Sequence, residues 1–152
     1  MNAVAARAGR APVLVIGVGS ELRRDDAVGR RVVERLETDG LGAVEVRSLH
    51  QLTPELAVEI SGRRQVVFVD ASVEVSEVTV VPLEPQVAAT SLSHHLDPAS
   101  LLALTARIGE PPQQAVAVHV PARDLGLGTR PSPEGRRAIA QALVVVQDLV
   151  AP

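Results

Sequence analysis

Apolar and polar positions along the chain predict strands that alternate with helices. The all-apolar runs Val13–Ile16 and Val66–Val69 are typical of strands buried on both faces of a sheet. Further strands are expected near Val44–Arg47, Glu77–Leu83 and Ala115–Val120. Apolar residues at helical spacing predict helices from about Ala27 to Glu37, and from Thr53, from Asp97 and from Ser132 onward.

Each predicted helix has an apolar stripe that would face a sheet. The stripes are Val28, Val32, Val33 and Leu36; Leu56 and Ile60; Leu101, Leu102 and Ile108; and Ile139, Leu143 and Val146. The second helix begins at Thr53-Pro54, which supplies a capping hydroxyl and a proline at the first helical position.

The connection between the third and fourth strands sets the direction of the fourth strand. It is too short for a parallel crossover, so the fourth strand should run antiparallel to the third. The order of strands and helices along the chain predicts an α/β fold, a three-layer α/β/α sandwich. Its five-stranded, mostly parallel twisted sheet has one antiparallel strand and helices on both faces. A flexible N-terminal lead, residues 1–12, precedes a single domain, residues 13–152.

Composition excludes several functions. The chain has no Cys and no Lys, which rules out thiolate catalysis, Cys-ligated zinc and Schiff-base chemistry. One aromatic residue, Phe68, and a net charge of −3 give nucleic acid neither a stacking platform nor a basic surface. Neither a signal peptide nor a membrane-spanning run is recognisable, so we expect a cytoplasmic protein that does not bind membranes.

The stretch Val13–Gly29 combines a buried strand, two glycines and two adjacent carboxylates before a helix. A helix N-terminus attracts anions, but Asp25 and Asp26 would repel a phosphate there, so a cation is expected. Aspartate is also a favoured N-cap residue. We assign Asp25 to capping or loop support and Asp26 to the site.

Asp70 follows a buried strand directly, and it either faces water or serves a site. In open α/β sheets, ligands bind beyond the carboxyl ends of the strands, where the strand order reverses. If the first and third strands flank that reversal, Asp26 and Asp70 converge on one crevice. Three ligands from carboxylates and an imidazole would suit a metal that brings its other ligands with it.

Four histidines are candidates for the imidazole. His94 and His95 lie in the loop before the third helix, where each alone is expected to be an ordinary, partly exposed loop residue. His50 ends the second strand on the same rim and could touch a substrate. His119 is expected in the wall of the fifth strand.

Three motifs in this order resemble the hydrogenase maturation proteases. They are Gly17-x-Gly19-x-x-Leu22-x-x-Asp25-Asp26-x-x-Gly29, then Val69-Asp70-Ala71, then Ser93-His94. The resemblance runs from about Val13 to Leu149, and Ser20 stands where the family frequently has Asn. It implies that Asp26, Asp70 and His94 are metal ligands, with His95 as the neighbouring alternative to His94.

The resemblance also implies an activity. Members of this family are endopeptidases that remove the C-terminal extension of a NiFe-hydrogenase large-subunit precursor, a transient partner, after nickel insertion. Asp26, Asp70 and His94 would recognise nickel that the precursor holds on thiolates, and zinc or cadmium could replace it in crystals. Either Asp26 or Asp70, or a nickel-polarised water, would promote hydrolysis.

Two other functions remain open on the sequence. A nonproteolytic metal-checking or chaperone module would use the same three residues to bind a precursor without cleaving it. A nucleotide-binding domain would use Gly17-Val18-Gly19, but Leu22 occupies the third glycine position of the phosphate-binding motif. Its acidic ribose ligand would be Asp39, which lies past the first helix.

Overall fold

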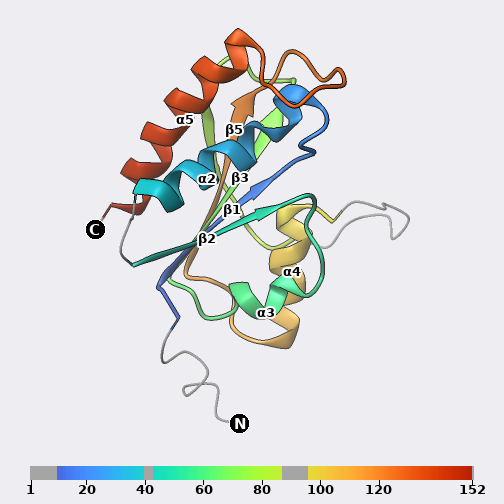
Figure 1. Cartoon of the computed structure of the whole chain (residues 1–152). Helices are drawn as coiled ribbons and strands as arrows, with labels where there is room; N and C mark the ends of the chain where they lie inside the picture. The colour runs from blue at the N-terminus through green and yellow to red at the C-terminus, as the bar shows by residue number, and fades with distance from the viewer. Residues whose placement is uncertain (1–9, 40–42, 87–95, 152) are drawn as a thin grey trace.

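The computed structural model describes residues 10–39, 43–86 and 96–151 (Figure 1). Its strands are β1 (Val13–Val18), β2 (Val44–Leu49), β3 (Gln65–Ser72), β4 (Thr79–Pro82) and β5 (Gln114–Pro121). Its helices are the short 3₁₀ helix η1 (Arg24–Ala27), α2 (Val28–Asp39), α3 (Leu56–Ile60), α4 (Pro98–Ile108) and α5 (Pro133–Val150).

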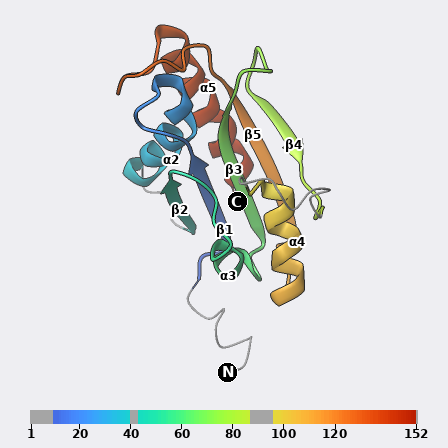
Figure 2. The same ribbon diagram turned by 90° about the vertical axis from the view of Figure 1, so that its right-hand side faces the viewer.

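The five strands form one sheet in the order β2-β1-β3-β5-β4. All neighbouring pairs are parallel except β4 and β5. Helices α2 and α5 cover one face, and α3 and α4 cover the other (Figures 1 and 2). The predicted three-layer α/β/α sandwich with one antiparallel strand is confirmed.

Alternation along the strands divides the core into two apolar layers. Val13 and Val15 of β1 pack with α2 and α5, whereas Leu14 and Ile16 pack with α3 and α4. All four side chains are buried, which explains why the strand reads as a continuous apolar run. Phe68 belongs to the second layer.

Two details of the predicted helices were wrong. Helix α3 begins at Leu56, after the N-cap Glu55, and no side chain caps it. Thr53 contributes its backbone carbonyl, which accepts the N–H of Leu56, and not a capping hydroxyl. Ile108 is 56% exposed, because it is the last residue of α4 and no further helical turn covers it.

Strand β4 runs antiparallel to β3, as predicted, but it lies at the edge of the sheet beside β5. Strand β3 continues through Asp70 to Ser72, three residues beyond the predicted end at Val69. Residues 10 and 11 contact the domain: the Arg10 guanidinium donates to the carbonyl of Val58, and the backbone N–H of Ala11 donates to the carboxylate of Glu45. None of the helices in the described ranges is both long and apolar enough to cross a bilayer.

The strand order reverses between β1 and β3. From β1 the chain moves outward to β2, and it then returns to place β3 on the other side of β1. Residues that follow these two strands therefore meet at one edge of the sheet, where ligands bind in open α/β folds.

Candidate active site

A cavity of about 520 Å³ lies at this reversal point. Its walls come from four segments: the end of β1 with η1, the β2–α3 connection, β3, and the start of α4. The lining residues are Val18, Gly19, Ser20, Arg23, Asp26, His50, Gln51, Leu52, Phe68, Asp70, Leu96, Asp97 and Pro98. Asp26 and Asp70, 44 positions apart in the chain, thus line one cavity, as the sequence predicted.

Asp26 lies in η1, and its carboxylate turns back toward the end of β1. Its Oδ2 accepts the backbone N–H of Ser20 at 2.8 Å. The donor is the backbone N–H of residue 20, so the bond does not depend on the side chain there. Having Ser20 where the family frequently has Asn therefore leaves this bond in place. Asp26 lies inside η1, and Ala27 separates it from α2, so it does not occupy the N-cap position of that helix that the sequence offered as an alternative.

Asp70 is exposed to solvent through the cavity, but the surrounding protein keeps most bulk water away. This desolvation is the main cause that raises the pKa of Asp70 to about 6, and the nearby negative charge of Asp26 adds to it. The N–H of Ala71, at 2.8 Å from Oδ1, and the charge of His119 lower the pKa in part. A carboxyl group with this pKa changes protonation near neutral pH, as a general base or acid requires.

The predicted third ligand, His94, and its neighbour His95 lie outside the described residues. The residues that follow them, Leu96, Asp97 and Pro98, line the cavity. Among the described residues, no three His, Cys, Asp or Glu side chains are grouped so that they could hold a metal ion. The role of His94 as a ligand stays a prediction.

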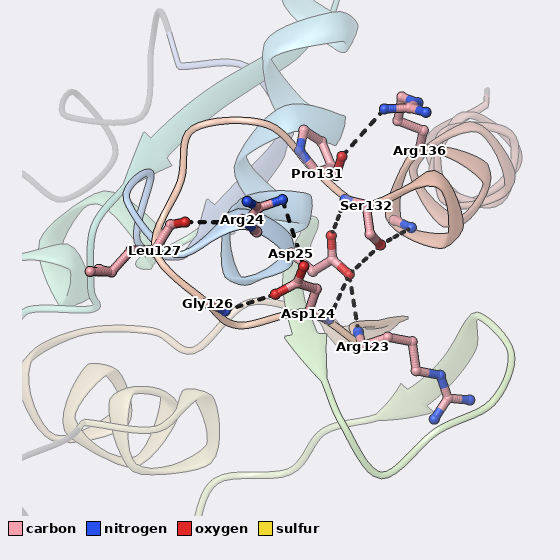
Figure 3. Close-up of polar contacts among 10 residues, drawn as sticks. Arg24, Asp25, Arg123, Asp124, Gly126, Leu127, Pro131, Ser132 and Arg136 are labelled. Atoms are coloured by element: carbon pink, nitrogen blue, oxygen red, sulfur yellow. Dashed lines mark hydrogen bonds and ion pairs between the residues drawn. The ribbon is translucent and has the colours of Figure 1, made fainter.

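Asp25 has the opposite environment to its neighbour Asp26: it is completely buried (Figure 3). Its carboxylate accepts the backbone N–H groups of Arg123, Asp124 and Ser132 and the hydroxyl of Ser132, at 2.7–3.1 Å. Burial alone would raise the pKa of Asp25, but these hydrogen bonds outweigh it and lower the pKa. Asp25 therefore ties η1 to residues 122–132, a segment that we call the strap, which confirms its predicted role in loop support.

The glycines of the first motif allow close packing of backbone segments. A Cβ on Gly19 would collide with the carbonyl of Asp26, and one on Gly29 would collide with the carbonyl of Val69. Gly19 also has a φ of +155°, which other residues rarely adopt. These close contacts account for both glycines without a phosphate, and two carboxylates occupy the turn that leads into α2.

Other polar residues of this region were less clear from the sequence. His50 lines the cavity, as predicted. His119 is the register partner of Asp70 on β5, and it is not among the described residues that line the cavity. Arg23 also lines the cavity, and the sequence analysis did not single it out. The sequence feature that could have pointed to Arg23 is its position inside the Gly-x-Gly–Asp-Asp motif.

Several solved structures share the fold of this chain. Over 90% of each chain, an endopeptidase of Escherichia coli is 28% identical to this protein, with a TM-score of 0.70. A hydrogenase 2 maturation peptidase of a Thaumarchaeota archaeon is 25% identical over 91% of this chain and 97% of its own, with a TM-score of 0.68. The hydrogenase maturating endopeptidase HybD of E. coli shares the fold, with 24% identity over 91% of each chain and a TM-score of 0.72. No protein-family model and no curated protein matches the sequence.

Proposed function

We propose that this chain, which belongs to the hydrogenase maturation protease family, is an endopeptidase that removes the C-terminal extension of a NiFe-hydrogenase large-subunit precursor. In this proposal the precursor carries nickel when it is recognised. The nickel is therefore part of the substrate and not a resident cofactor of this protein.

The observation that carries the proposal is the pairing of Asp26 and Asp70 in one cavity. Asp26 lies in η1 and Asp70 in β3, and Asp26 is near enough for its charge to raise the pKa of Asp70. Two carboxylates that repel each other favour an incoming cation, which would neutralise both. This arrangement supports recognition of a metal centre on a partner.

We assign nickel recognition to Asp26, Asp70 and His94. Carboxylate oxygen and imidazole nitrogen do not select nickel over zinc or cadmium, so selectivity would come from the precursor, which supplies thiolates. Binding of the metal by these residues would bring the bond to be cleaved into the cavity. A carboxylate, for which the pKa of Asp70 is suited, would activate water, or the nickel would supply this activation as a Lewis acid.

The test is incubation of the protein with purified precursor, followed by mass spectrometry of the precursor. We expect loss of the C-terminal extension from nickel-loaded precursor and no change in nickel-free precursor. Asp26→Asn should abolish the loss, whereas Asp148→Asn, which removes an exposed carboxylate from α5 on the other face of the sheet, should not.

An unchanged mass of nickel-loaded precursor would contradict the proposed protease. If that precursor still bound, and binding required Asp26 and Asp70, the nonproteolytic metal-checking module would be the correct function. A pull-down with the same two variants distinguishes these outcomes.

A further inference from the structure

Arg23 gives the cavity a positive charge opposite in sign to its aspartates. Among the described residues that line the cavity it is the only arginine, whereas Asp26, Asp70 and Asp97 are carboxylates. A substrate that presented only a cation would offer this guanidinium no anionic partner. The cavity is therefore suited to a substrate with two groups of opposite charge.

The main chain of Arg23 is fixed at both ends. Its N–H donates to the carbonyl of Ser20 at 3.3 Å, and its carbonyl accepts the N–H of Asp26 at 2.9 Å. A parallel β-bridge also joins it to Gly128 of the strap. The side chain therefore starts from a rigid turn, three residues from Asp26.

The guanidinium is oriented but not neutralised. Its Nε donates to the carbonyl of Leu125 at 3.2 Å, which uses one of its five N–H donors. Within the described ranges, no carboxylate lies close enough to the Arg23 side chain to form an ion pair. The terminal nitrogens can therefore bind an oxygen anion with the fork geometry that favours arginine over lysine.

We propose that Arg23 binds a carboxylate of the precursor and thereby fixes the direction in which the cleaved segment crosses the cavity. With the metal centre at Asp26 and Asp70 and the carboxylate at Arg23, each charge of the substrate meets its opposite. A reversed segment would bring a cation against the guanidinium and a carboxylate against the aspartates. The inference rests on the proposed function, because it takes the precursor as the ligand.

The carboxylate has two sources, an acidic side chain of the extension or the terminal carboxylate of the chain. Three chains are compared in their binding of nickel-loaded precursor and in its cleavage: wild type, Arg23→Gln and Arg23→Lys. Arg123→Gln is the matched control, because it removes the same charge from an exposed side chain of the strap (Figure 3). Thermal unfolding of each variant checks that the domain folds.

We expect Arg23→Gln to raise the Kd and KM for precursor about tenfold, with kcat changed less. Arg23→Lys should fall between it and wild type, and Arg123→Gln should match wild type. One precursor variant should bind wild-type protein about tenfold more weakly than the natural precursor does. The same precursor variant and the natural precursor should bind Arg23→Gln equally. That variant is an Asp→Asn or Glu→Gln change in the extension if a side chain binds, or an extension lengthened by two glycines if the terminus binds.

An unchanged Kd in folded Arg23→Gln would overturn the role of Arg23 and leave the protease proposal standing. An equal loss of affinity in Arg123→Gln would also overturn this role, because it would indicate a general charge effect. The same conclusion would follow if Arg23→Gln weakened the binding of every precursor variant as much as that of the natural precursor. Binding without cleavage by wild type would instead contradict the proposed protease, while the Kd values would still decide the role of Arg23. Absence of binding by wild type would overturn both.

Discussion

Asp25 and Asp70 are carboxylates of the same chemistry in opposite environments. Asp25 is completely buried, receives four hydrogen bonds and has a lowered pKa. Asp70 faces a cavity, receives a single hydrogen bond from the described part of the chain, donated by the N–H of Ala71, and has a pKa raised to about 6. The comparison teaches that hydrogen-bond donors, more than burial, determine which aspartate stabilises the fold and which stays reactive.

The largest effect should come from removing the reactive carboxylate. We expect Asp70→Asn to lower the rate of precursor processing at least about 100-fold, because it loses both a metal ligand and a candidate general base. His94→Ala should have the same effect if His94 is the third ligand. Mass spectrometry of precursor over time measures the rate. Processing at the normal rate by either variant would show that the altered residue is not part of the active site.

Removing the buried carboxylate should instead destabilise the fold. Asp25→Ala leaves the N–H groups of three strap residues and the Ser132 hydroxyl without their acceptor, so we expect a loss of about 3 kcal/mol or more. Urea unfolding followed by circular dichroism measures it. Asp124→Ala, which removes a half-exposed partner of Arg24, should cost about 1 kcal/mol or less. Equal losses in the two variants would contradict the special role of Asp25.

Removing one donor should give a smaller loss. The Ser132 hydroxyl donates to Asp25 at 2.7 Å and accepts the N–H of Gly135 at 3.0 Å, which caps α5. We expect Ser132→Ala to cost about 1–2 kcal/mol in the same unfolding experiment. The loss of stability in the double variant Asp25→Ala/Ser132→Ala should be smaller than the sum of the losses in the two single variants. Full additivity would show that the two side chains act independently.

The smallest effect should be a gain in stability from Asp70→Asn. Ionised Asp70 disfavours the folded state, because its folded pKa of about 6 lies above the unfolded value of 3.8. The wild type therefore loses stability as the pH rises from about 4 to about 6, and the variant does not. At pH 8 we expect the variant to melt about 2–4 °C higher, corresponding to about 1 kcal/mol or less, since solvent screens the charge.

Below pH 4 this advantage should vanish, because the wild-type carboxyl is then neutral in both states. Scanning calorimetry at pH 3.5 and pH 8 tests the prediction. A stability difference between variant and wild type that is the same at both pH values would mean that the ionisation of Asp70 is not the cause.

The sequence predicted the parts of the fold that depend on local pattern. The apolar run Val13–Ile16 and the stripe of α2 are buried as expected, because period and composition report burial directly. It also predicted that Asp26 and Asp70 meet, because the crossover rules for parallel sheets place the carboxyl ends of neighbouring strands together.

The sequence did not predict the other contacts between segments that are distant along the chain. The pairing of His119 with Asp70 depends on the register between β3 and β5, which no local pattern specifies. The bonds of Asp25 join residues about 100 positions apart, so the sequence indicated loop support without naming the strap. The exposure of Ile108 depends on where α4 ends relative to its neighbours, and helical periodicity does not contain that information.

The strap has a consequence for synthesis on the ribosome. The donors that hold Asp25 belong to residues 123, 124 and 132, which are translated after all five strands of the sheet. Until then the turn that carries Asp26 lacks its anchor, so a nascent chain cannot assemble the complete cavity. The protein therefore acquires its site only after residue 132 has been made, and a fragment that stops before residue 123 should be inert.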